Sequence, residues 1–256
     1  MSRIQQLFQH KKNNILNIYC TAGYPNLNST LPIIEALEKS GADIVELGMP
    51  YSDPLADGET IQNSATRALQ NGMTIKRLFE QLQPLRPQLS IPVVLMGYMN
   101  PVLQYGFERF CADAADVGVD ALILPDMPVR EYETHYKAIV EKYQLDFVFL
   151  VTPETSEQRV KSLDGLSSGF LYAVSSSSTT GIQKDFSLVQ AYLQRIQTYQ
   201  LKNPVLVGFG ISDKESFNSA CKYANGAIIG SAFIKALEHT NNESDTTQQF
   251  VTAVLA

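Results

Sequence analysis

The chain has 256 residues, of which 45% are hydrophobic and 18% charged, and its formal net charge is −6. This balance is ordinary for a globular enzyme with a large core, and the acidic excess argues against nucleic acid as a partner, because phosphate backbones require a basic face. No apolar stretch approaches the roughly 20 residues of a membrane helix, and the N-terminus lacks the apolar segment of a signal peptide. We therefore expect a cytoplasmic protein that does not bind membranes.

Short β-branched apolar runs alternate with segments of helical periodicity along the whole chain. Eight runs predict strands at residues 15–20, 43–47, 93–97, 121–125, 147–151, 169–174, 205–208 and 227–230. Strands this apolar are buried on both faces, which indicates a parallel sheet covered by helices. Eight units in about 250 residues favour a closed (β/α)8 TIM barrel over an open doubly wound sheet, which remains the alternative. We predict one α/β domain over residues 1–256, with an additional N-terminal helix.

The helical segments between these runs have recognisable ends. Helices are predicted over residues 30–40, 106–117, 130–143 and 187–199. The first of them is followed by Gly41, a residue type that commonly ends helices. Ser212 and Glu215 stand three positions apart and predict a capping box at the start of the next helix. A loop over 241–247 is expected before a last helix over 248–255.

The second predicted strand contains a glutamate among Ile, Val and Leu residues. Alternation places Ile44 and Glu46 on one face and Val45 and Leu47 on the other, and one of these faces looks into the barrel. Active sites of such barrels lie at the carboxyl ends of the strands. A buried carboxylate is costly unless it is paired or its pKa is raised. Glu46 is therefore a candidate general acid/base, the alternative being a glutamate satisfied by a buried partner.

The loop after this strand carries two further carboxylates, Asp53 and Asp57, and is stiffened by Pro50 and Pro54. Loop aspartates are usually turn or cap residues, so chemistry alone leaves open whether either belongs to a site. Glu46 and one of them could divide proton transfer and charge stabilisation between them.

Glycine-rich turns after the last strands predict a phosphate site. The seventh strand runs into Gly208-Phe209-Gly210 and the eighth into Gly230-Ser231. Glycines at these places let backbone N–H groups approach an anion, and a helix opening at Ser231 adds the positive end of its dipole. Tight turns without a ligand are the alternative. The ligand implied is a phosphorylated small molecule.

The cysteines and histidines predict no metal site. The three cysteines lie too far apart for a disulfide framework or a zinc pattern. None of the three histidines has a second ligand at metal spacing.

Residues 46–58, ELGMPYSDPLADG, closely resemble the signature of tryptophan synthase α subunits. Further matches span nearly the whole chain and lie at residues 21–25, 96–101, 118–120, 125–128, 208–211 and 230–232. The resemblance implies a lyase of L-tryptophan biosynthesis, which cleaves indole-3-glycerol phosphate into indole and glyceraldehyde 3-phosphate by a retro-aldol reaction.

The resemblance also implies roles for particular residues. Glu46 would be the principal acid/base, which protonates C3 of the indole ring and assists removal of the glycerol hydroxyl proton. Asp57 would accept a hydrogen bond from the indole N–H and stabilise the positive charge that develops. Tyr19, Tyr172 and Phe209 would contact the substrate, although ordinary barrel core is an equal alternative for all three.

The same resemblance places the phosphate on Gly181, Gly210, Gly230 and Ser231, and Thr180 in a lid that engages the catalytic aspartate. The loop after the sixth strand departs from the family pattern Gly-Val-Thr-Gly, because it reads Ser178-Thr179-Thr180-Gly181. Serine lacks the backbone freedom of glycine, so lid closure, and hence rate, could differ from that of relatives.

A partner is implied as well. In the family this subunit pairs with a β subunit that holds pyridoxal phosphate and consumes the indole, in an α2β2 heterotetramer. No cofactor is implied in this chain itself. Residues 50–53 and Asn100 match surfaces that face the partner. Two alternatives stay open: a phosphosugar isomerase or epimerase on the same barrel, and a non-catalytic subunit that only activates its partner.

Overall fold

The fold is taken from a computed structural model of the chain, which describes residues 2–84, 88–174, 186–208 and 210–256. Within these ranges, nine parallel strands form one sheet in the order β5-β4-β3-β2-β1-β9-β8-β7-β6. The strands are β1 (Ile15–Thr21), β2 (Ile44–Gly48), β3 (Val93–Met96), β4 (Ala121–Ile123), β5 (Asp146–Phe147), β6 (Leu150–Val151), β7 (Leu171–Val174), β8 (Val205–Gly208) and β9 (Gly226–Ile229).

The two ends of this strand order meet, because β5 and β6 are consecutive pieces of one chain segment. Only Val148 and Phe149 separate them. The Val148 N–H donates to the Leu122 carbonyl at 3.0 Å, and the Phe149 carbonyl accepts from the Tyr172 N–H at 3.0 Å. One segment therefore bridges β4 and β7, and the sheet closes into a barrel. The predicted closed barrel is confirmed and the open sheet is excluded, while the fifth predicted strand is present in two pieces.

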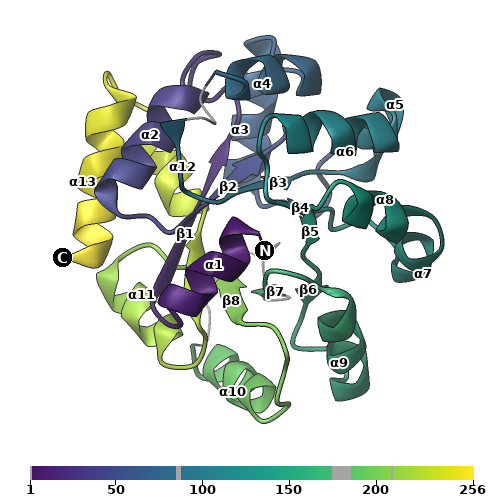
Figure 1. Ribbon diagram of the computed structural model, residues 1–256. Helices are drawn as coiled ribbons and strands as arrows, with labels where there is room; N and C mark the ends of the chain where they lie inside the picture. Colours follow the sequence, from purple (N-terminus) through teal and green to yellow (C-terminus); the bar gives the residue numbers. More distant parts are fainter. Residues whose placement is uncertain (1, 85–87, 175–185, 209) are drawn as a thin grey trace.

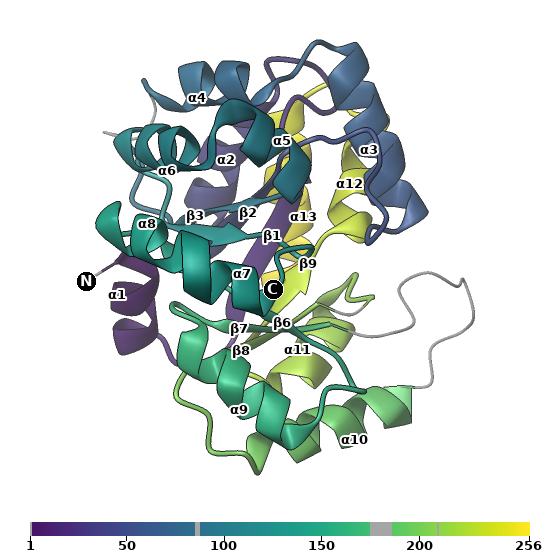
Figure 2. The same ribbon diagram turned by 90° about the vertical axis from the view of Figure 1, so that its right-hand side faces the viewer.

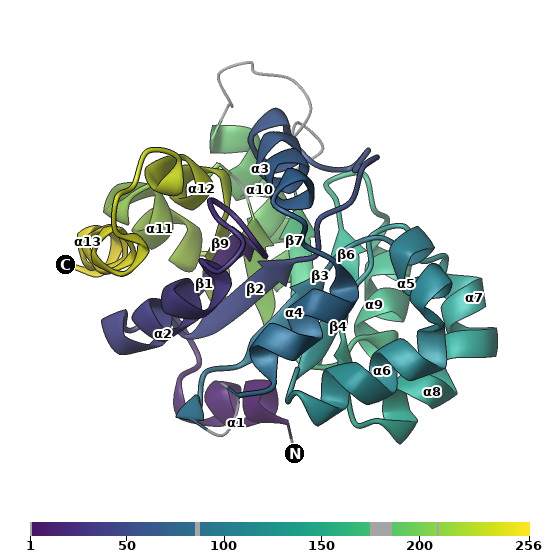
Figure 3. The same ribbon diagram turned by 90° about the horizontal axis from the view of Figure 1, so that it is seen from above.

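Helices surround the barrel (Figure 1; seen from above in Figure 3). In chain order they are α1 (Arg3–His10), α2 (Thr30–Ser40), α3 (Glu59–Gln70), α4 (Ile75–Leu82), α5 (Met99–Tyr105), α6 (Phe107–Asp116), α7 (Val129–Glu131), α8 (Lys137–Lys142), α9 (Glu157–Leu166), α10 (Phe186–Gln197), α11 (Lys214–Cys221), α12 (Ser231–Leu237) and α13 (Glu243–Leu255). A π-helical turn (Tyr132–Tyr136) joins α7 to α8. None of the helices in the described ranges has the length and apolar character that crossing a membrane requires.

Several predicted helix ends are confirmed and others shift. The helix over 30–40 ends as expected at Gly41, whose φ of 94° is the left-handed conformation that glycine adopts easily. The capping box of α11 uses Asp213 and Ser216 rather than Ser212 and Glu215, so that prediction was wrong by one residue. The last helix begins at Glu243, because Asn242 caps it, and most of the predicted loop over 241–247 is helical.

The predicted N-terminal helix closes one end of the barrel. Ile4 of α1 packs among inward-facing residues that include Ile15 and Phe170, and Arg3 forms an ion pair with Asp120 at 2.9 Å. Figure 2 shows α1 at the left end of the molecule, with the loops that follow the strands at the opposite end. Because α1 covers the amino-terminal end, the carboxyl end is left for ligands, as in other TIM barrels.

Two apolar layers fix the orientation of the strand side chains. The inner layer fills the barrel with Ile44, Val94 and Ile228 among others. The outer layer packs Val45 and Leu47 against the helices. The alternation predicted for β2 is therefore confirmed, and the face that carries Glu46 is the inner one.

Candidate active site

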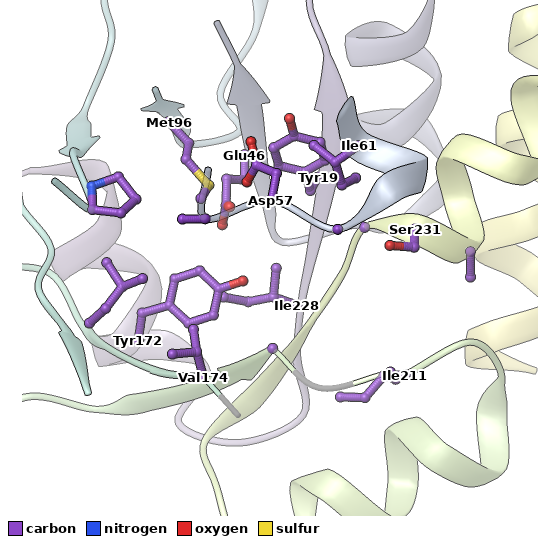
Figure 4. A pocket seen from close by; sticks show the side chains of 18 of the residues that line it. Tyr19, Glu46, Asp57, Ile61, Met96, Tyr172, Val174, Ile211, Ile228 and Ser231 are labelled. Atoms are coloured by element: carbon purple, nitrogen blue, oxygen red, sulfur yellow. The ribbon is translucent and has the colours of Figure 1, made fainter. Parts of the chain in front are cut away.

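A cavity of about 680 Å³ opens at the carboxyl ends of the strands. Its walls come from nearly every side of the barrel (Figure 4). Strand residues that line it include Tyr19, Glu46, Met96, Leu150, Tyr172, Val174, Gly208 and Ile228, and loop or helix residues include Asp57, Ile61, Gly210, Ile211, Gly230, Ser231 and Lys235. The described residues hold no cluster of His, Cys, Asp and Glu side chains arranged for a metal.

Glu46 lies in β2, level with Tyr19 of β1 on one side and Val94 of β3 on the other. Its side chain is buried, with only 1% of the residue exposed. Burial raises the pKa of this carboxyl to about 8, the hydrogen bond from Asn17 opposes the rise, and the charge of Asp57 adds to it. A carboxyl with this pKa is a proton donor at neutral pH.

Asp57 belongs to the loop between β2 and α3 and points toward Glu46 (Figure 4). Burial raises the pKa of its carboxyl to about 6, against a hydrogen bond with the hydroxyl of Tyr98. That hydroxyl also accepts from the Ala56 N–H at 3.1 Å, so Tyr98 holds the loop and the carboxylate together. Asp53, the other candidate of this loop, is exposed and does not line the cavity.

The two carboxyl groups therefore differ in protonation although they share one cavity. Near neutral pH, a pKa of about 8 leaves Glu46 protonated and a pKa of about 6 leaves Asp57 mostly ionised. Two carboxyl groups whose environments separate their pKa values can act as an acid and as an anion in one reaction.

Tyr19 and Tyr172 face the cavity from opposite sides, and glycines make room for both rings. A Cβ on Gly48 would lie 2.1 Å from the Tyr19 hydroxyl, and a Cβ on Gly208 would lie 2.4 Å from the Tyr172 hydroxyl. Burial raises the pKa of both phenols, and so do the neighbouring carboxylates. Both tyrosines therefore stay neutral and contribute flat, largely apolar walls, which suits an aromatic ring.

The predicted phosphate turns follow β8 and β9, the two strands that come next after β1 in the barrel order. Gly210, Gly230 and Ser231 all line the cavity, and α12 begins at Ser231. Three further predicted site residues, Thr180, Gly181 and Phe209, lie outside the described residues, as do Ser178 and Thr179. The structure thus brings together Glu46, Asp57, Tyr19, Tyr172, Gly210, Gly230 and Ser231 around one cavity.

The similarity of the chain to a known protein family identifies the enzyme to which this cavity belongs. A family model described as tryptophan synthase alpha chain matches residues 4–255. The chain belongs to the tryptophan synthase alpha chain family. The reaction of an alpha chain, and of this one, is the cleavage of indole-3-glycerol phosphate to indole and glyceraldehyde 3-phosphate in tryptophan biosynthesis. Alpha chains work with a β subunit, on which the pyridoxal phosphate resides.

Individual relatives agree with this assignment. The tryptophan synthase alpha chain of Flavobacterium johnsoniae is 57% identical over 252 residues, which cover 98% of each chain. That of Bacteroides thetaiotaomicron is 52% identical over 93% of each chain. Among solved structures, the A-subunit from Pyrococcus furiosus superimposes with a TM-score of 0.86 at 35% identity, over 96% of this chain and 99% of that one. Tryptophan synthase from M. tuberculosis gives a TM-score of 0.86 at 29% identity, over 99% and 98% of the two chains.

Membership of the alpha chain family excludes the phosphosugar isomerase or epimerase alternative, and the closed barrel predicted from the sequence is confirmed by these structures. The site also contains residues that sequence reasoning missed, namely Asn17 and Tyr98 beside the carboxylates and Lys235 on α12. Asn17 could have been found, because it shares the inward phase of Ile15 and Tyr19 on an apolar strand. Lys235 stands one helical turn after Ser231, a spacing that places both on one face.

Proposed function

We propose that Glu46 is the acid/base catalyst of this alpha chain and that Asp57 is the anion that binds the indole N–H. The observation that carries the proposal is the pairing of a buried carboxyl group, Glu46, with a half-buried one, Asp57, in one cavity, with pKa values of about 8 and about 6. A proton donor and an anion side by side match what cleavage of an indole–carbon bond requires.

The reaction balances with these two groups alone. The protonated Glu46 carboxyl gives its proton to C3 of the indole, and the positive charge that forms on the ring nitrogen is stabilised by the Asp57 carboxylate. The Glu46 carboxylate then takes the proton of the hydroxyl on the adjacent glycerol carbon. The C–C bond breaks, its electron pair restores the aromatic ring, and the aldehyde forms. Glu46 ends protonated, as it began.

The remaining contacts orient the substrate. Tyr19 and Tyr172 form walls for the indole ring, with Phe209 as a further apolar contact. Gly181, Gly210, Gly230 and Ser231 bind the phosphate through backbone N–H groups, and Thr180 engages Asp57 when the loop closes. The presence of the carboxyl groups after and within β2 and of the described glycine turns after β8 and β9 around one cavity supports this orientation.

Residues 50–53 and Asn100 are proposed to face the β subunit in an α2β2 complex. The Asn100 amide donates to the Tyr51 hydroxyl at 3.2 Å, so the two predicted surfaces are in contact with each other. The chain is further proposed to fold as one domain over residues 1–256 and to act in the cytoplasm. The place of the family in amino-acid biosynthesis supports this location, and cell fractionation tests it.

The test of the catalytic roles is indole release from indole-3-glycerol phosphate by the wild type and by Glu46→Gln, with the β subunit added to half of the samples. Glutamine keeps the shape of the side chain but cannot carry the proton. We expect Glu46→Gln to lower cleavage by at least about a hundredfold, the usual scale for a general acid/base, while still activating the β subunit. Cleavage within a few-fold of the wild type would overturn the role of Glu46.

A further inference from the structure

A buried amide lies directly beneath the proposed catalyst. Asn17 of β1 is completely buried, with 0% of the residue exposed, and its Nδ2 donates to Oε2 of Glu46 at 3.1 Å. Asn17 pairs in register with Ile44 and shares the inner face of the barrel with Ile15. An amide in an otherwise apolar layer is costly to bury unless it is hydrogen-bonded. The contact with Glu46 satisfies the Nδ2 donor, whereas Oδ1 of Asn17 is buried without a hydrogen-bond partner among the described residues.

The hydrogen bond distinguishes the two oxygens of the Glu46 carboxyl. Oε2 accepts from Asn17, whereas Oε1 is buried without a hydrogen-bond partner among the described residues. Oε2 can accept from the amide both as a carboxylate oxygen and as the carbonyl oxygen of the protonated acid. An oxygen that already accepts an N–H is the poorer place for the proton, which is then carried by Oε1.

We propose that Asn17 is the positioning residue of Glu46, which keeps Oε2 unprotonated throughout the reaction and thereby places the transferable proton on Oε1. The inference rests on the proposed role of Glu46 as the acid/base and deepens it. Oε1 gives the proton to the indole carbon and takes up the hydroxyl proton, while the bond to Oε2 persists in both protonation states. The carboxyl group therefore does not need to rotate between the two proton transfers.

The other titratable groups around Glu46 do not duplicate this effect. Tyr19 on β1 and Tyr172 on β7 are neutral phenols, because burial raises their pKa. Burial likewise raises the pKa of the Cys20 thiol to about 12, so it is neutral. Asp57 is the charged neighbour, and its negative charge favours the protonated form of Glu46. Asn17 has the contrary effect, because the hydrogen bond that its N–H donates stabilises the ionised form of Glu46 and lowers its pKa.

The experiment compares the wild type with Asn17→Leu, which has a similar volume and no polar atom, and with Asn17→Asp, which keeps the shape but replaces the donor with a second carboxyl. Ile15→Val is the matched control, because it changes the same inner face of β1 two residues away. For each protein, kcat and KM for indole-3-glycerol phosphate cleavage are measured between about pH 5 and pH 10, together with Tm.

Loss of the N–H donor disfavours the ionised form, so in Asn17→Leu the alkaline limb of kcat/KM should move to higher pH by at least about half a unit. Asn17→Asp should move it further, because two adjacent carboxyl groups share one proton. We expect kcat at neutral pH to fall about tenfold with KM little changed, since Asn17 does not line the cavity. Ile15→Val should lower Tm and leave the alkaline limb of the kcat/KM profile at the same pH as in the wild type.

A second readout does not depend on turnover. Infrared difference titration detects the protonated carboxyl of Glu46 directly, with Glu46→Gln as the blank, and should give a higher pKa in Asn17→Leu than in the wild type. If Glu46→Gln is inactive but neither the infrared pKa nor the alkaline limb moves in Asn17→Leu and Asn17→Asp, the role of Asn17 is overturned and that of Glu46 stands. If Glu46→Gln stays active, the proposed function fails instead, whatever the Asn17 variants show.

Discussion

At the scale of single residues, the sequence already pointed to the proposed acid/base, but not to the groups that tune it. Glu46 was predictable because a carboxylate interrupts a run of apolar strand residues on the inward phase. The choice of Asp57 over Asp53 needed the family resemblance or the fold, because both are loop aspartates. Tyr98 could not be predicted to hold Asp57, since the contact joins loops 41 positions apart in the sequence.

The Tyr19 ring lies directly against Gly48, so a side chain at position 48 should disturb the cavity wall. A Cβ on Gly48 would overlap the Tyr19 hydroxyl, so Gly48→Ala must displace the Tyr19 ring from its place in the cavity wall. We expect kcat/KM for indole-3-glycerol phosphate to fall at least about tenfold, and overpacking to destabilise the fold by about 1–3 kcal/mol. Steady-state kinetics and denaturant unfolding measure the two effects.

Gly165→Ala is the matched control for that variant. A Cβ on Gly165 meets no atom within 4 Å, and the residue lies in α9. Alanine in a helix should stabilise the protein by about 0.5–1 kcal/mol and leave activity unchanged. Equal kinetics for Gly48→Ala and Gly165→Ala would show that the position of the Tyr19 ring does not matter.

At the scale of helices and strands, the periodicity of the sequence was sufficient for the number and order of the βα units but not for all of their boundaries. The fifth predicted strand is split because its first half pairs with β4 and its second half with β7. The strands that pair with the two halves, β4 and β7, lie elsewhere in the chain. The local sequence pattern therefore does not predict the division. The start of α11 was misplaced because Ser212, Asp213 and Ser216 are all good cap residues, and only their hydrogen bonds show which one caps.

Lys235 of helix α12 is expected to contribute to substrate binding. Lys235 is the one cationic side chain among the described residues that line the cavity, where Glu46 and Asp57 are acidic. A phosphate dianion entering this cavity needs a compensating positive charge. We expect Lys235→Met to raise KM about tenfold, which corresponds to about 1.4 kcal/mol, with kcat nearly unchanged.

The control removes the same charge from Lys222, an exposed residue at the end of α11 that does not line the cavity. Initial rates at low and high salt separate the two lysines, because screening should weaken only the contribution of Lys235. A KM that rises equally in Lys222→Met and Lys235→Met would mean that net charge, and not the position of Lys235, attracts the substrate.

At the scale of the whole molecule, α1 covers one end of the barrel, while the catalytic loops and the proposed partner surface share the other. Leu55 stands in the loop after β2 and is 88% exposed, an unusual state for a large apolar side chain next to the predicted interface. We expect Leu55→Asp to weaken activation by the β subunit at least about tenfold, measured by titrating β subunit into the cleavage assay.

Cleavage by Leu55→Asp without the β subunit should match the wild type, because the side chain points to solvent. Leu255→Asp, at the exposed end of α13, provides the comparison and should be activated normally. Normal activation of Leu55→Asp would remove this loop from the interface.

If Glu46 acts as the acid and Asp57 as the anion, the ionisation of both groups determines how kcat/KM depends on pH. The reaction needs Asp57 ionised, so activity should fall as pH drops below about 6, and it needs Glu46 protonated, so activity should fall as pH rises above about 8. We predict a bell-shaped profile for the wild type, with the acidic limb absent from the residual activity of Asp57→Asn. A wild-type profile that rises through pH 8 would contradict these two roles, because Glu46 would then be needed in its ionised form.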